Sequence, residues 1–192
     1  MANETGASES GFQKKRYTAP ELVRGTVQFV QNIPRLVRAT RGDRVSEQFA
    51  EKIMLAVTAV NECQYCTRYH SELARETGMD QATIDRLLES DIDAAVDEGE
   101  RPALLFAQAY AEADEEPSPA AVAELREAYG PAKATDVQAF VRAIYFGNLI
   151  GNTYDAVKFA AGQRADRGRH CLRDAAASVG QVIERVRERC PV

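Results

Sequence analysis

The stretch EKIMLAVTAVNECQYCTRYH, residues 51–70, joins a long apolar run to a dense group of reactive side chains. Its second half carries Cys63, Cys66 and His70, which are two of the four cysteines and one of the two histidines in the chain. If a helix begins at Cys63, the other two residues follow at i+3 and i+7 and share one of its faces. The spacing therefore predicts a single reactive surface on one helix.

The chemistry of this group depends on thiolate formation. The unpaired N–H groups at a helix N-terminus favour a thiolate over a thiol, and a nearby imidazole can take the thiol proton. Such settings lower a cysteine pKa from about 8.5 to roughly 3.5–7.5. Two cysteines at this spacing can also close into a disulfide after one of them is oxidised. The motif predicts thiol redox chemistry, and the spacing alone leaves open which cysteine attacks.

The rest of the chain predicts an all-α fold of about seven to eight helices. Apolar residues recur three and four positions apart, and no segment alternates as a half-buried strand does. The expected helices begin near residues 20, 46, 63, 80, 102, 119, 135 and 171. Pro34 is expected to interrupt or end the first of them. Gly78 and Gly130 are expected to end two others, and the acidic segment 90–99 is expected to be a loop.

Composition divides the chain into three parts. Residues 1–16 are rich in Ser, Gly, Glu and Lys and are expected to form a disordered tail. Residues 17–162 hold the apolar periodic segments and form the predicted helical domain, and residues 163–192 are expected to form a C-terminal helical extension. Within the domain, Gly147 and Gly151 lie four residues apart, a spacing that lets another helix approach closely in the fold or in an oligomer.

The composition is typical of a soluble globular protein. The 192 residues are 45% hydrophobic and 28% charged, with a net charge of −5 and a pI near 5.2. No broad basic field favours nucleic acid, no apolar run reaches the roughly 18 residues of a membrane helix, and no signal-peptide core is present. We therefore expect a cytoplasmic protein that binds neither nucleic acid nor membrane. In that compartment a C-x-x-C pair is typical of redox or metal chemistry.

The C-x-x-C-x-x-x-H motif, with Glu51 twelve residues before Cys63, resembles the alkylhydroperoxidase D / carboxymuconolactone decarboxylase family. The later apolar segment, with Asn148 and Asn152, is also similar to that family. The resemblance covers about residues 20–162, so the helical domain is expected to be alkylhydroperoxidase D-like. It implies an all-α fold and a small homo-oligomer, a trimer or a hexamer.

The resemblance also implies a function, that of a thiol-dependent peroxidase or disulfide oxidoreductase. Carried over to this chain, Cys66 is the attacking cysteine and Cys63 is its resolving partner. His70 then assists the deprotonation of Cys66, and Glu51 supplies a proton relay. The implied substrate is a hydroperoxide or a disulfide, and the implied reductant is a thiol or dithiol. No cofactor is implied.

One position departs from the family pattern. The best-known redox members carry a histidine immediately before the second cysteine, where this chain has Tyr65. The proton relay is then one imidazole shorter, which affects the expected peroxidase rate more than the disulfide chemistry. A lyase like carboxymuconolactone decarboxylase remains an alternative on the same fold, although members with that activity lack the cysteine pair.

Two further alternatives use the same residues without catalysis. A redox sensor would oxidise and reduce the cysteine pair reversibly and turn over slowly. A structural zinc module would need four tetrahedral ligands, and the motif supplies three of them. The candidates for the fourth ligand are His170, Cys171 and Cys190.

Overall fold

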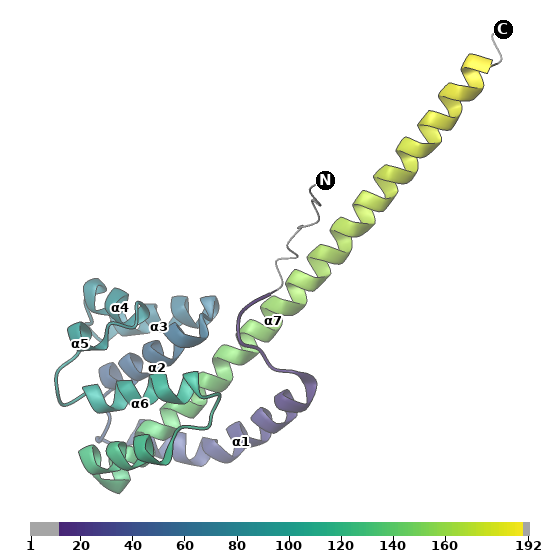
Figure 1. Ribbon diagram of the computed structural model, residues 1–192. Helices are drawn as coiled ribbons and strands as arrows, with labels where there is room; N and C mark the ends of the chain where they lie inside the picture. Colours follow the sequence, from purple (N-terminus) through teal and green to yellow (C-terminus); the bar gives the residue numbers. More distant parts are fainter. Residues whose placement is uncertain (1–11, 190–192) are drawn as a thin grey trace, which may run out of the picture. The chain divides into compact units, whose positions relative to one another are not determined.

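The computed structural model describes the backbone of residues 12–189 and the side chains of residues 12–170 and Arg173. Every regular element in this range is an α-helix, so the predicted all-α fold is confirmed (Figure 1). The described helices are α1 (Ala19–Arg41), α2 (Glu47–Asn61), α3 (Gln64–Glu76), α4 (Gln81–Leu88), α5 (Ile92–Ala95), α6 (Arg101–Glu112) and α7 (Pro119–Arg189). None of these helices is both long and apolar enough to span a lipid bilayer.

The chain divides into two compact units. The larger comprises residues 13–153 and therefore contains α1 to α6 and the first part of α7. The smaller contains, of the described residues, Phe12 and the part of α7 from Tyr154 onward. In the smaller unit the rings of Phe12 and Phe159 lie 6.2 Å apart between centroids. All four predicted site residues belong to the larger unit.

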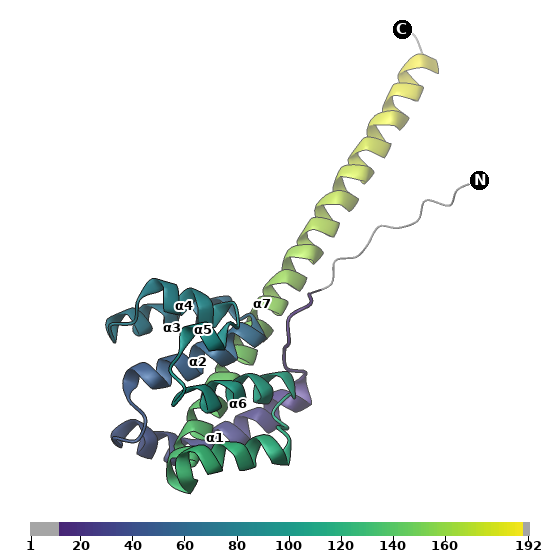
Figure 2. The same cartoon turned by 60° about the vertical axis from the view of Figure 1, so that its left-hand side comes forward.

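Helix α2 lies at the centre of the larger unit. It contacts α3 and α4 on one side and α6 on the other (Figures 1 and 2). Ile53, Leu55, Ala56 and Val57 are completely buried, which explains why the apolar run in this segment is nearly continuous. Ser46 caps the helix by accepting a hydrogen bond from the Phe49 N–H.

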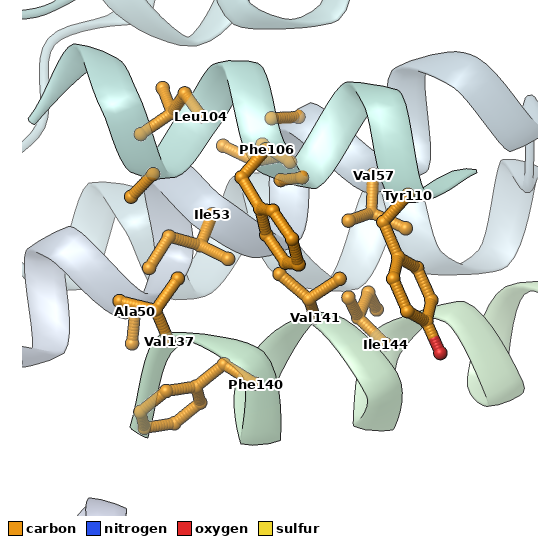
Figure 3. Close-up of a cluster of buried hydrophobic side chains, with 14 of the residues drawn as sticks. Ala50, Ile53, Val57, Leu104, Phe106, Tyr110, Val137, Phe140, Val141 and Ile144 are labelled. Carbon is orange, nitrogen blue, oxygen red and sulfur yellow. The ribbon is translucent and has the colours of Figure 1, made fainter. Parts of the chain in front are cut away.

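The hydrophobic core is formed where three helices meet (Figure 3). On each helix the buried side chains recur mostly three or four residues apart, as the sequence periodicity predicted. The core residues drawn in Figure 3 include Ala50, Ile53 and Val57 from α2, Leu104, Phe106 and Tyr110 from α6, and Val137, Phe140, Val141 and Ile144 from α7. This core holds α2 in place and therefore fixes the helix that leads into the cysteine motif.

Several predicted helix ends are confirmed by the backbone. Gly78 follows α3 with a φ of +87°, and Gly130 interrupts α7 with a φ of +70°. Glycine adopts positive φ without the steric cost that other residues meet. Pro131 then restarts the helix, so α7 consists of two helices joined at a kink.

The prediction for Pro34 was wrong, because α1 continues through it to Arg41. Proline removes one backbone hydrogen bond, but Pro34 is exposed, so water can satisfy the carbonyl group that it leaves free. Leu22 and Leu36, which lie on either side of the proline, are partly buried and pack against the core, and the Phe29 ring stacks on the ring of Phe146.

Two other local predictions need correction. The loop expected at residues 90–99 contains the short helix α5. The backbone also stays helical from Pro131 through Gly162 to Arg189, so no separate helix begins near residue 171. A single glycine in a helix costs only about 1 kcal/mol, and the surrounding Ala, Arg, Gln and Lys residues favour helix.

The predicted disordered tail is only partly covered by the structure. Residues 1–11 lie outside the described residues. Close to the predicted end of the tail, Lys14 Nζ donates a hydrogen bond to the Glu62 carbonyl oxygen at 2.9 Å. Lys15 Nζ lies 2.8 Å from the Asp114 carboxylate and also donates to the Ala111 carbonyl oxygen. These contacts attach the segment before α1 to the body of the larger unit.

Candidate functional site

The two cysteines of the motif lie at the start of α3. Cys63 is the N-cap residue and is completely buried, and Cys66 lies in the first turn and is partly exposed. Their Sγ atoms are 2.7 Å apart and in hydrogen-bond contact. The Cys66 N–H also donates to Cys63 Sγ at 3.4 Å. A disulfide bond of about 2.0 Å therefore needs only a small further approach of the two sulfurs.

The neighbouring sulfur changes the acidity of Cys66. The hydrogen bond to Cys63, together with burial and the charge that Cys63 can carry, raises the pKa of the Cys66 thiol above its ordinary value of 9.0. Two thiolates at this separation would repel each other, so the pair holds at least one proton. In the reduced protein Cys66 is therefore a thiol at neutral pH. This differs from the low thiol pKa that the motif predicts.

The predicted acid and imidazole are in direct contact. His70 Nδ1 lies 2.8 Å from Glu51 Oε2, across the packed surfaces of α3 and α2. Both side chains are nearly buried, with 12% and 11% exposed. Because a carboxylate can only accept, Nδ1 carries the hydrogen, and Nε2 is the ring nitrogen that remains able to accept a proton. The Tyr69 ring packs against the imidazole in a T-shaped arrangement, with centroids 5.2 Å apart.

The expected contact between His70 and Cys66 is not formed. The two residues are one helical turn apart on α3, but the structure contains no hydrogen bond between the imidazole and the Cys66 sulfur. The imidazole is held by Glu51 on α2, whereas the Cys66 sulfur is paired with Cys63. The structure thus brings the four predicted residues together as two pairs, one of sulfurs and one of an acid and a base.

Comparison with known proteins shows a similarity over part of the larger unit. Residues 27–109 match the sequence profile described as the Carboxymuconolactone decarboxylase family. Over this segment the chain is similar to the carboxymuconolactone decarboxylase family. The predicted family resemblance is confirmed, and the family includes peroxidase-like and decarboxylase-like proteins. No curated protein matches the chain at a significant level.

The match to the carboxymuconolactone decarboxylase family includes Glu51, Cys63, Cys66 and His70 but ends within α6. Helix α7 lies outside the matched residues and still contacts the motif. A Cβ atom added to Gly151 would lie 2.8 Å from Cys63 Sγ, so the backbone of α7 passes directly beside that sulfur. Sequence reasoning identified Gly151 only as a packing glycine, because nothing in its local sequence indicates what it touches.

The two asparagines noted in the sequence also lie between α7 and α2. Asn152 Nδ2 donates to the backbone oxygen of Asn61 at 2.7 Å and to that of Lys15 at 2.9 Å. Thr58 Oγ1 donates to Asn148 Oδ1 at 3.2 Å. Asn61 immediately precedes Glu62, whose left-handed backbone ends α2, and Cys63 follows. These hydrogen bonds fix the turn that leads into the cysteine motif.

A cavity of about 580 Å³ borders the acid side of the site. Its lining is apolar except for two threonines and three carboxylates, and the residues are Thr40, Val45, Glu47, Ala50, Glu51, Met54, Leu73, Glu76, Thr77 and Phe140. Glu51 therefore links this cavity to His70. The two cysteines are not part of the lining.

The zinc hypothesis is tested only in part. Among the residues whose side chains are described, no group of three or more histidine, cysteine or acidic side chains could hold a metal ion. His170 is exposed and belongs to the smaller unit. The side chain of Cys171 and all of Cys190 lie outside the described residues.

Proposed function

We propose that the protein is a thiol-dependent peroxidase or disulfide oxidoreductase that works through Cys63 and Cys66. The observation that carries the proposal is the contact of the two sulfurs at 2.7 Å beside a buried Glu51–His70 pair. The first arrangement can form a disulfide, and the second can hold and transfer a proton. The similarity of residues 27–109 to a family that includes peroxidase-like proteins supports the same function.

The proposed cycle has three steps, each balanced in atoms and electrons. The Cys66 thiolate attacks the outer oxygen of a hydroperoxide, and the O–O bond breaks to give a cysteine sulfenic acid and an alcohol after protonation. The Cys63 thiol then displaces hydroxide from the sulfenic sulfur, which forms the Cys63–Cys66 disulfide and releases water. A thiol or dithiol reductant restores both thiols and is itself oxidised to a disulfide.

Accessibility favours Cys66 as the attacking residue. Cys66 is partly exposed, whereas Cys63 has no exposed surface and is enclosed by the α7 backbone at Gly151. A hydroperoxide can therefore reach Cys66 without any rearrangement of the helices. Cys63 is already in contact with Cys66 and needs no access to substrate in order to form the disulfide.

His70 and Glu51 have the proposed role of a proton relay. The Glu51 carboxylate accepts from Nδ1 and stabilises the imidazolium that forms when Nε2 takes the Cys66 proton through solvent. The same proton can then be delivered to the departing alkoxide. Because Glu51 also borders the cavity, the pair can exchange protons with solvent in that cavity.

We also propose a homo-oligomer, a trimer or a hexamer, in the cytoplasm. The support for an oligomer comes from α1, which has apolar residues on its outer face as well as on its inner face. The outer residues, which we call the outer α1 stripe, are between 38% and 67% exposed and comprise Val23, Val27, Val30, Ile33 and Val37. Contiguous exposed apolar surface is typical of a protein interface.

The test is consumption of an organic hydroperoxide by reduced, metal-free protein with dithiothreitol. We expect turnover by the wild type and its loss in both Cys66→Ser and Cys63→Ser. The Cys63→Ser variant should still consume about one equivalent of peroxide in a burst, because it retains the attacking thiol. Absence of consumption by the wild type, with the Cys66→Ser variant behaving identically, would exclude the peroxidase.

A redox sensor is the second candidate, and two observations favour it. The raised pKa of Cys66 and the missing contact with His70 both slow thiolate attack. A sensor would form the Cys63–Cys66 disulfide completely and reversibly but would turn over slowly. The rate of the first oxidation in the same assay separates the two functions.

A further inference from the structure

We infer that Gly151 of α7 is a positioning residue that fixes the Cys63 sulfur against Cys66. The thiol pair is then set by a helix that lies outside the segment matched to the family. The inference rests on the proposed function only in that it concerns the same disulfide. Whether the disulfide serves a peroxidase or a sensor does not affect it.

The first observation is the space beside Gly151. A Cβ atom at this position would lie 2.8 Å from Cys63 Sγ and 3.7 Å from the Tyr65 ring. The first separation is far shorter than normal contact between carbon and sulfur. Gly151 lies inside a helix without the positive φ that would itself require glycine. Contact with the sulfur therefore explains the absence of a side chain.

A second glycine on the same helix shows that this contact is specific. Gly147 lies one turn before Gly151, and a Cβ atom added there would meet no heavy atom within 4 Å. Both glycines are partly buried, and both lie after the kink at Gly130. They therefore differ mainly in the presence of the Cys63 sulfur, which makes Gly147 a matched control.

The position of α7 against the motif is itself fixed. Asn152, the next residue, is completely buried and donates one hydrogen bond to the Asn61 backbone oxygen and another to that of Lys15. Asn61 lies two residues before Cys63, so the hydrogen bond ties α7 to the same turn that holds the sulfur. The backbone of α7 at Gly151 and the turn before Cys63 are therefore joined by hydrogen bonds. They cannot move apart without breaking the buried hydrogen bond between Asn152 and Asn61.

The consequence for the thiol pair follows directly. Cys63 is completely buried, and its sulfur contacts the Cys66 sulfur and also lies where a Cβ atom on Gly151 would collide with it. A methyl group at position 151 would force Cys63 Sγ out of its present place. A disulfide tolerates only a narrow range of geometry, so we expect the Cys63–Cys66 bond to become less stable.

The test compares Gly151→Ala with Gly147→Ala in the full chain. The equilibrium between dithiol and disulfide is measured in glutathione buffers by alkylation and peptide mass spectrometry, which reports Cys63 and Cys66 separately from the other cysteines. We expect Gly151→Ala to lower the equilibrium constant for disulfide formation at least tenfold, equivalent to about 30 mV. Gly147→Ala should leave it within twofold. Equal values for the two variants would overturn the inference.

A double variant keeps the test decisive if Gly151→Ala folds poorly. Removal of the sulfur in Cys63→Ala clears the space that the new methyl group needs. The stability lost in Gly151→Ala should therefore be recovered when Cys63→Ala is added, as urea unfolding would show. If the double variant is as unstable as Gly151→Ala alone, the sulfur is not the obstacle and the inference fails.

The glutathione equilibrium needs no peroxide turnover. A wild type that consumes no peroxide but shows the expected shift in Gly151→Ala would reject the peroxidase and retain the positioning role. A wild type that turns over, with equal equilibrium constants in Gly151→Ala and Gly147→Ala, would retain the peroxidase and reject the positioning role of Gly151.

Discussion

At the scale of single residues, the reactivity of the site depends on how one proton is shared between two sulfurs. Cys63 and Cys66 lie 2.7 Å apart in a largely buried place at the start of α3. The helix N-terminus favours negative charge there, but the second sulfur and burial oppose it. The hydrogen bond to the Cys63 sulfur has a larger effect than the helix N-terminus, so the pKa of Cys66 is raised.

This raised pKa predicts how the reactivity of Cys66 depends on pH. Only the thiolate reacts, so the rate of Cys66 alkylation should rise about tenfold per pH unit between pH 7 and pH 9, below the thiol pKa. In Cys63→Ala the hydrogen bond and the charge of the neighbouring sulfur are removed, and the pKa of Cys66 should fall. The pH profile of that variant should therefore shift to lower pH. Peptide mass spectrometry after iodoacetamide pulses measures this, and an unchanged or higher midpoint would contradict the cause assigned.

The Glu51–His70 pair gives a second prediction at this scale. Glu51→Gln preserves the shape of the side chain but removes its charge, so the imidazolium loses the group that stabilises it. We expect peroxide turnover to fall about 10²-fold or more, as for the loss of a general acid–base group. Stability should fall by about 1.5–3 kcal/mol, the value of a hydrogen bond to a charged group.

The control for this variant is Glu47→Gln. Glu47 borders the same cavity and is exposed, and it has no contact with His70. Turnover and the urea unfolding midpoint should both match the wild type. Equal loss of turnover in the two variants would indicate that the charge of the cavity, and not the pair with His70, matters.

At the scale of helices, α2 supports both the core and the site. Its residues Ile53, Leu55, Ala56 and Val57 are completely buried, and Glu51 extends from the same helix to His70. A change in the packing of α2 is therefore transmitted to the acid–base pair.

Substitutions at Ile53 test the packing of α2. This side chain lies at the centre of the core, among residues from α6 and α7 (Figure 3). Ile53→Val should cost about 0.5–1.5 kcal/mol and Ile53→Ala about 2–5 kcal/mol, because a cavity remains. Urea unfolding measures both. Gln31→Ala on the exposed surface of α1 should stay within about 0.5 kcal/mol, and a similar loss there would argue against specific packing of α2.

At the scale of the whole molecule, the outer α1 stripe predicts self-association. Val30 lies in the middle of the stripe and is 55% exposed. Val30→Glu places a charge in the proposed interface and should reduce the assembly to a smaller species, because burying an unpaired charge is costly. Light scattering coupled to size-exclusion chromatography measures the mass. Gln28→Glu on the same helix should not change it, and a monomeric wild type would exclude the proposal.

Local sequence signals predicted most of the secondary structure. The caps at Ser46 and Asp80 and the glycines at 78 and 130 act through their own backbone neighbours, so they can be recognised without knowledge of the fold. The predicted helix end at Pro34 was wrong because the cost of a proline inside a helix depends on whether its face of α1 is exposed to water. The helix expected to begin near residue 171 is part of α7, because the backbone stays helical through Gly162 and a single glycine opposes helix only weakly.

The sequence by itself determined the helical class and the residues of the reactive motif, because both depend on spacing along one chain. Only the tertiary structure decided which groups meet. It paired His70 with Glu51 and separated the imidazole from Cys66, and it placed Gly151 against Cys63, which lies 88 positions earlier. Contacts at such separations are set by the packing of α2, α3 and α7, and no local pattern encodes them.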